Sequence, residues 1–135
     1  MTTKIPVILI VEDDAVLQSL YIEHCTRLGM SCIQIYDGSA AFDFVQHQLD
    51  EVDIVILDYM LPDMDGRVIL EKIKTIQPTA PTLVISAIAE KTDDLALLQS
   101  GAILEIVKGD VPLHVIIETI AEFLKEDVQS LALAA

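Results

Sequence analysis

Residues 54–66 read Ile-Val-Ile-Leu-Asp-Tyr-Met-Leu-Pro-Asp-Met-Asp-Gly, and they carry the clearest structural signal in the chain. It opens with a short apolar run, Ile54 to Leu57, which is typical of a buried strand and ends abruptly at Asp58. Beyond the stretch, apolar residues return at helical spacing: Ile69, Leu70, Ile73 and Ile76. The pattern predicts a strand, a polar strand end and an amphipathic helix.

The same unit recurs on both sides of this stretch. Four further apolar runs, rich in Val and Ile, predict strands: Val7 to Val11, Cys32 to Tyr36, Thr82 to Ile85 and Ile103 to Val107. Helical spacing follows each of them: Leu17, Leu20, Tyr21, Cys25 and Leu28; Ala41, Phe42, Val45 and Leu49; Leu95 and Leu98; Leu113, Ile116, Ile117, Ile120 and Leu124. Strict alternation predicts a parallel sheet with helices on both faces. Five units are too few for an eight-stranded barrel, so we expect an open, doubly wound α/β sheet in one domain.

The composition excludes several classes of function. Eight Lys and Arg against 22 Asp and Glu give a formal net charge of −14, so we do not expect this domain to bind nucleic acid or anionic membranes directly. No apolar run approaches the ~18 residues of a membrane span. Cys25 and Cys32 form no CxxC pair, so we expect reduced thiols and a cytoplasmic location.

Polar side chains follow four of the five expected strands, at the edge where open parallel sheets bind ligands. They are Glu12, Asp13 and Asp14 after the first strand, Asp58 after the third, Ser86 (beside Ala87) after the fourth, and Lys108 after the fifth. Singly, each has an ordinary explanation, because Asp13 or Asp14 would cap the next helix and Ser86 would bond to backbone. Together, at one edge of one sheet, they predict a site.

The charges in this set predict its chemistry. Asp13 and Asp58 would repel each other unless a cation lies between them, and a few hard oxygen ligands suit hydrated Mg²⁺. Once Mg²⁺ and the Lys108 ammonium offset its charge, a carboxylate can attack a phosphoryl donor, so we expect Asp58 to form an acyl phosphate. Lys108 and the Ser86 hydroxyl would then stabilise the phosphoryl oxygens.

Four segments of the chain resemble the receiver domain of two-component response regulators. They are Ile-Leu-Ile-Val-Glu-Asp-Asp (8–14), Val-Ile-Leu-Asp-Tyr-Met-Leu-Pro-Asp-Met-Asp-Gly (55–66), Leu-Val-Ile-Ser-Ala (83–87), and Gly-Ala (101–102) followed six residues later by Lys108. The resemblance extends from Ile5 to about Leu124. It implies a flavodoxin-like (βα)5 receiver domain over residues 4–125, with strand order 2-1-3-4-5. Residues 126–135 are then a C-terminal helix extension or a disordered tail.

The resemblance also implies roles for the acidic residues. Asp58 would be the phosphoacceptor. Asp13 would bind Mg²⁺ directly, Glu12 would act mostly through water, and Met60 would lend its backbone carbonyl to the metal. The cofactor implied is therefore Mg²⁺.

The remaining residues and the partners follow from the same resemblance. Ser86 would be the switch hydroxyl, Ala87 the small neighbour that leaves access to the phosphoryl group, and Lys108 the ammonium partner. A sensor histidine kinase or a histidine phosphotransfer protein would donate the phosphoryl group. A downstream protein or an output domain would read a conformational change on the fourth helix, fifth strand and fifth helix. No enzymatic activity is expected beyond self-phosphotransfer and autodephosphorylation. Formation of a homodimer is left as an open possibility.

Two positions depart from the family pattern. Gly109 stands where the family has a cis proline, and a non-proline cis bond costs ~3 kcal/mol, so we expect either strain or a rebuilt loop. Glu105 replaces the aromatic residue that links phosphorylation to the output face, so we expect intact phosphorylation and atypical output. Both departures keep open a pseudo-receiver, a binding module whose interactions do not depend on phosphorylation.

A third function class is a phosphohydrolase of the haloacid-dehalogenase kind, suggested by Asp-Met-Asp-Gly at 63–66. In that family the paired Asp stands directly at a strand end. Here residues 60–62 intervene and Asp58 already occupies the strand end, so this class is disfavoured.

Overall fold

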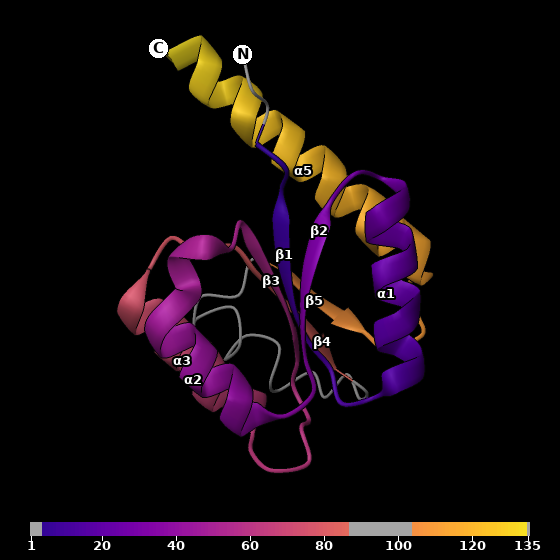
Figure 1. Cartoon of the computed structure of the whole chain (residues 1–135), viewed down its shortest axis with the longest axis vertical. Helices are drawn as coiled ribbons and strands as arrows, with labels where there is room; N and C mark the ends of the chain where they lie inside the picture. The colour runs from indigo at the N-terminus through magenta and orange to yellow at the C-terminus, as the bar shows by residue number, and fades with distance from the viewer. Residues whose placement is uncertain (1–3, 87–103, 135) are drawn as a thin grey trace.

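A computed structural model of the chain describes residues 4–86 and 104–134, with side chains for 4–85 and 106–125 (Figure 1). The first elements are β1 (Val7–Val11), α1 (Ala15–Arg27), β2 (Ser31–Ile35), α2 (Gly38–Gln48) and a short 3₁₀ turn (Leu49–Glu51). They are followed by β3 (Ile54–Asp58), α3 (Gly66–Ile76), β4 (Thr82–Ser86), β5 (Leu104–Val107) and α5 (Leu113–Ala134). The helix expected around Leu95 and Leu98 lies outside the described residues.

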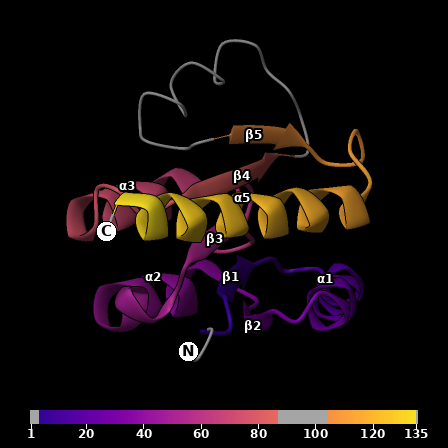
Figure 2. The ribbon, with the colours of Figure 1, turned by 90° about the horizontal axis from the view of Figure 1, so that it is seen from above.

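The five strands form one parallel sheet in the order β2-β1-β3-β4-β5, which confirms the predicted topology (Figure 2). At its centre, Val11 of β1 pairs with Leu57 of β3, and Asp58 pairs with Ile85 of β4. The three central strands therefore reach their carboxyl ends at the same level. Glu12 and Asp58 come next in register after Val11 and Leu57, so the sheet places them side by side.

Alternate residues of β1 face two separate cores, because side chains along a strand point in opposite directions. Ile8 and Ile10 pack with apolar residues of α1 and α5, whereas Leu9 and Val11 pack with those of α2 and α3. Figure 1 shows α2 and α3 together on one side of the sheet, away from α1 and α5. These four β1 side chains are fully buried, which explains why this strand is continuously apolar.

The sequence just after β1 determines where α1 begins. Asp14 accepts hydrogen bonds from the backbone N–H groups of Val16 (2.8 Å) and Leu17 (3.1 Å), so it is the N-cap of the helix. This assignment settles which acidic residue caps α1. Glu12 and Asp13 are left for the edge of the sheet.

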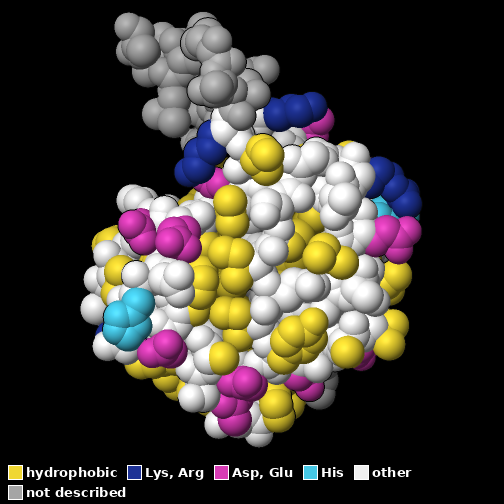
Figure 3. Space-filling view, viewed as in Figure 1, with side chains coloured by type: hydrophobic (Ala, Val, Ile, Leu, Met, Phe, Trp, Pro, Cys, Tyr) yellow, Lys and Arg dark blue, Asp and Glu magenta, His cyan; other side chains and the backbone are white. Residues whose placement is uncertain are grey.

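Acidic side chains are dispersed among apolar and neutral ones on the face seen in Figure 3, as expected for charges that interact with solvent. Within the described ranges, no helix is long and apolar enough to cross a membrane. Cys25 and Cys32 are free thiols, and Cys25 is buried in the core shared by α1 and α5.

Candidate functional site

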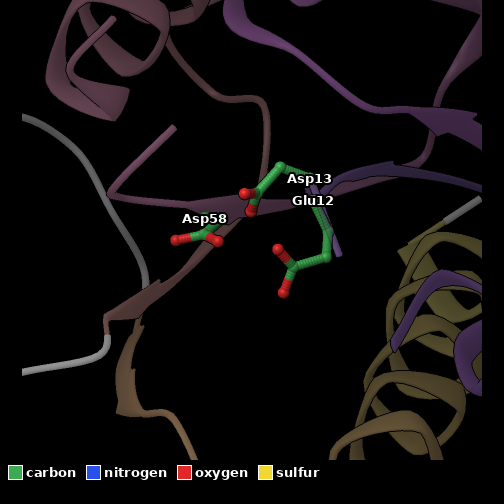
Figure 4. Close-up of side chains that lie close together, drawn as sticks. All are labelled: Glu12, Asp13 and Asp58. Atoms are coloured by element: carbon green, nitrogen blue, oxygen red, sulfur yellow. The ribbon is translucent and has the colours of Figure 1, made fainter. Parts of the chain in front are cut away.

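Three carboxylates converge at the carboxyl end of the sheet (Figure 4). Glu12 and Asp13 follow β1, and Asp58 is the last residue of the neighbouring strand β3. One carboxylate oxygen of each residue lies within 4.8 Å of the other two. Glu12 and Asp58 expose only 3% and 4% of their surface, whereas Asp13 is exposed. The structure thus brings the three acidic residues together in a site that is buried on one side and open on the other.

Lys108 joins this cluster from the turn after β5. Its Nζ lies 2.8 Å from Glu12 Oε1 and 3.3 Å from Asp58 Oδ2. The other oxygen of Asp58, Oδ1, accepts a hydrogen bond of 3.0 Å from the backbone N–H of Met60. Separate donors therefore hold the two oxygens of Asp58, and this fixes the orientation of the carboxylate.

The pKa values of the site reflect burial together with an excess of negative charge. Burial raises the pKa of Glu12, and the neighbouring Asp58 raises it further. The hydrogen bond with Glu12 raises the pKa of Asp13, and desolvation adds to this. Burial lowers the pKa of Lys108, but its contacts with Glu12 and Asp58 outweigh that effect and the pKa is raised overall. One ammonium group does not neutralise three carboxylates, so the site favours a further cation.

The donor set fits a hard divalent cation. Glu12, Asp13 and Asp58 offer only carboxylate oxygens, which are the ligands that Mg²⁺ prefers. Because Asp13 is exposed, the open side is accessible to the water ligands that Mg²⁺ usually retains. Met60 presents its N–H to Asp58, and a metal contact from its carbonyl stays a prediction.

The loop after β3 requires glycine at position 66. The N–H of Gly66 donates to Tyr59 O at 2.7 Å, so α3 begins directly against the end of β3. A Cβ atom on Gly66 would lie 2.7 Å from Asp58 O and 2.8 Å from the Cα of Tyr59. Both distances are too short for a carbon atom, so only glycine permits this close approach beside Asp58.

The acidic residues farther along this loop have structural partners. Asp63 accepts hydrogen bonds from the N–H groups of Gly38 (2.7 Å) and Ser39 (2.8 Å) and so caps the first turn of α2 from outside, in addition to the N-cap residue Asp37. Asp65 accepts one from the N–H of Arg67 (2.9 Å) and is the N-cap of α3. Because both carboxylates cap helices, the structure offers no support for a hydrolase centre at this pair.

Three other predicted site residues are described in part or not at all. Ser86 is the last residue of β4 and pairs with Val107, whereas its side chain and Ala87 lie outside the described part of the chain. The backbone of Glu105 pairs with Val84, and its side chain also lies outside that part. Their predicted roles therefore stay predictions.

Gly109 lies in the turn that follows Lys108, at the position where the resemblance implies a cis proline. No peptide bond among residues 4–86 and 104–134 is cis, and Gly109 has a φ of +91°, a left-handed conformation that favours glycine. The N–H of Asp110 donates to Val107 O at 3.0 Å and closes the turn. The alternatives were a strained cis bond and a rebuilt loop, and the structure has the rebuilt loop. Lys108 still contacts the carboxylates of Glu12 and Asp58.

Gln18 is a residue beside the site that the sequence patterns did not single out. It is fully buried on α1, and its Nε2 donates to the backbone carbonyl of Glu12 at 3.0 Å. Its spacing of three and seven positions from the core residues Tyr21 and Cys25 places it on the buried face of the helix. A polar residue on the buried face of a predicted helix is the sequence signal that could have identified Gln18.

Known proteins resemble the chain in sequence and in structure. The response regulator receiver domain family model matches residues 8–124. The regulatory protein VanRc of Enterococcus gallinarum is 30% identical over 109 residues, which are 81% of this chain and 46% of that protein. A protein-glutamate methylesterase/protein-glutamine glutaminase of Xanthomonas oryzae is 32% identical over an aligned length of 141, which covers 99% of this chain and 38% of that protein. The chain thus spans less than half the length of these two relatives. A CheY-like receiver domain protein of Methanospirillum hungatei shares the fold, with a TM-score of 0.83 at 23% identity over 94% of this chain and 99% of that one.

Proposed function

Because the chain belongs to the response regulator receiver domain family, we propose that it accepts a phosphoryl group on Asp58 from a partner phosphohistidine. The partner is a sensor histidine kinase or a histidine phosphotransfer protein, and the reaction depends on Mg²⁺. The observation that carries this proposal is the buried Asp58 carboxylate, held by Lys108 and the Met60 N–H beside Glu12 and Asp13. We expect the signal to leave through a face that includes β5 and α5, together with the helix predicted around Leu95 and Leu98, which lies outside the described residues.

The transfer is a displacement at phosphorus. One oxygen of Asp58 attacks the phosphorus, and the new O–P bond forms as the P–N bond to the donor imidazole breaks. The electron pair of that bond returns to the imidazole, whose other nitrogen carries the proton that keeps the ring neutral. The product is an acyl phosphate on Asp58 and a free histidine on the partner.

The residues around Asp58 prepare it for this step. The Met60 N–H and Lys108 hold the carboxylate in one orientation, which lowers the entropy cost of the attack. Lys108 also lies close enough to Asp58 to stabilise the negative charge on the oxygens of the transferred phosphoryl group. When bound by Glu12, Asp13 and Asp58, Mg²⁺ would supply the positive charge that offsets the incoming phosphoryl group.

Incubation with acetyl phosphate and Mg²⁺, followed by intact mass measurement, tests the proposal. The parent chain should gain one phosphoryl group, and Asp58→Asn or chelation of Mg²⁺ should abolish the gain. Asp63→Asn is the matched control, because that carboxylate caps α2 and should leave the gain intact. A parent chain that gains nothing would indicate a pseudo-receiver, whereas steady turnover of phosphomonoesters would indicate a hydrolase.

A further inference from the structure

Gln18 of α1 is the one fully buried polar residue beside the carboxylates among the described side chains, with none of its surface exposed. We propose that Gln18 is a positioning residue that holds the peptide unit joining Glu12 to Asp13 and thereby aims both carboxylates at Asp58. The inference rests on the proposed function, because it concerns the same Mg²⁺ and phosphoryl site.

The contacts of the Gln18 amide determine which way it points. Its Nε2 lies within hydrogen-bond distance of three carbonyl oxygens, those of Ile10 (3.1 Å), Glu12 (3.0 Å) and Ile35 (3.0 Å), so one of its two N–H groups is shared between two acceptors. Its Oε1 accepts a hydrogen bond of 3.0 Å from Gln34 Nε2, which also donates to the backbone carbonyl of Gln18 at 2.6 Å. Three acceptors around the nitrogen and one donor at the oxygen leave a single favourable orientation of the amide.

These contacts restrain the backbone from which the carboxylates extend. The carbonyl of Glu12 belongs to the peptide bond that links Glu12 to Asp13, so rotating that peptide would move both carboxylates. The N–H of Glu12 donates to Ile35 O at 3.0 Å, which is also an acceptor for Gln18. Asp14 is fixed on the other side as the N-cap of α1. With Gln18 in place, the peptide is restrained from both ends.

Glutamine suits this position for a physical reason. The site needs a neutral donor with two N–H groups, because a charged group with no exposed surface would carry a large desolvation cost. Methionine has nearly the same length and shape but no N–H group, so it would leave the Glu12 carbonyl without this donor. Gln18→Met therefore removes the restraint while keeping the packing of α1.

The test compares Gln18→Met with Cys25→Ala, a second buried position on the same helix whose side chain lies in the apolar core. Titration calorimetry with MgCl₂, below the unfolding midpoint of every variant, gives the Mg²⁺ dissociation constant. Gln18→Met should weaken Mg²⁺ binding about tenfold or more, as is usual when a partner behind a metal ligand is lost. Cys25→Ala should lower the thermal midpoint and leave the dissociation constant unchanged.

Each outcome separates positioning from stability. If Gln18→Met lowers the midpoint but binds Mg²⁺ as the parent does, the residue is merely structural and the inference is overturned. If the parent itself binds no Mg²⁺, the proposed function fails and the inference fails with it. If Gln18→Met does not fold, Gln34→Ala replaces it, because that change removes the donor that orients the Gln18 amide. Weaker Mg²⁺ binding by this folded variant supports the inference, and unchanged binding overturns it.

Discussion

The loop from β3 to α3 joins two acidic regions whose carboxylates behave in opposite ways. At the sheet edge, Glu12 is buried beside Asp58, and burial followed by this like charge raises its pKa. In the loop, exposed Asp63 accepts two backbone N–H groups from the start of α2, and these hydrogen bonds lower its pKa. Burial among like charges makes a site that attracts a cation, whereas N–H donors make a helix cap that needs none.

The two regions also depend on pH with opposite signs. Asp63 has a depressed pKa in the fold, so it contributes stability above its unfolded pKa, and this contribution is lost as pH falls through the folded value. Glu12 has a raised pKa, so its contribution is present below the unfolded pKa and is lost as pH rises through the folded value. A bound cation would reverse this loss at the site and would leave the cap unaffected.

Removing the Lys108 ammonium group from the site should have the largest effect. Lys108→Met leaves Glu12 and Asp58 without their cationic partner and should slow acyl-phosphate formation on the order of 100-fold, the usual effect of removing one donor to a developing oxyanion. Rates of phosphoryl gain from acetyl phosphate at fixed Mg²⁺ measure it. Lys125→Met, an exposed position on α5, is the control and should react at the parent rate. Equal rates for both variants would contradict the assigned role of Lys108.

Changing the glycine that connects the two regions should have a smaller effect, on stability. Gly66→Ala places a Cβ atom against the backbone of Asp58 and Tyr59, which should cost about 1–3 kcal/mol of unfolding free energy. Gly38→Ala is the comparison, because its Cβ would meet side-chain atoms, the Cγ of Met64 and, at 2.9 Å, the Oδ1 of Asp63, instead of backbone. Urea unfolding measures both variants. A larger loss for Gly38→Ala would show that the close approach at position 66 is not the tighter constraint.

The smallest expected effect concerns the cap alone. Asp63→Asn removes the charge that the α2 N–H groups favour, so the acid limb of the stability curve should become shallower below pH 3.8, the ordinary pKa of this side chain. Thermal midpoints measured from neutral to acid pH test this. Asp50→Asn, at an exposed position in the 3₁₀ turn, should follow the parent curve. If Asp63→Asn also follows the parent curve, the cap has no pH-dependent role.

The parts of the fold that could be predicted are those with a local chemical signature. Continuous apolar runs located β1 and β3 because strands buried on both faces tolerate few polar side chains, and Asp58 was expected where the run ends and is the last residue of β3. The acids after β1 show the limit of this reasoning. Either Asp13 or Asp14 could cap the next helix, and only the hydrogen bonds of Asp14 to α1 decided between them.

Residue patterns were enough to predict the alternation of strand and helix and the meeting of Glu12, Asp13, Asp58 and Lys108, because parallel strands all end at one edge of the sheet. Only the tertiary structure decided that Gln18 holds the Glu12 carbonyl and that Asp63 caps α2. The first contact joins residues that are 6 positions apart in the sequence, and the second joins residues that are 25 positions apart. Their partners are backbone atoms, which are the same at every residue, so no pattern of side chains could have shown where they lie.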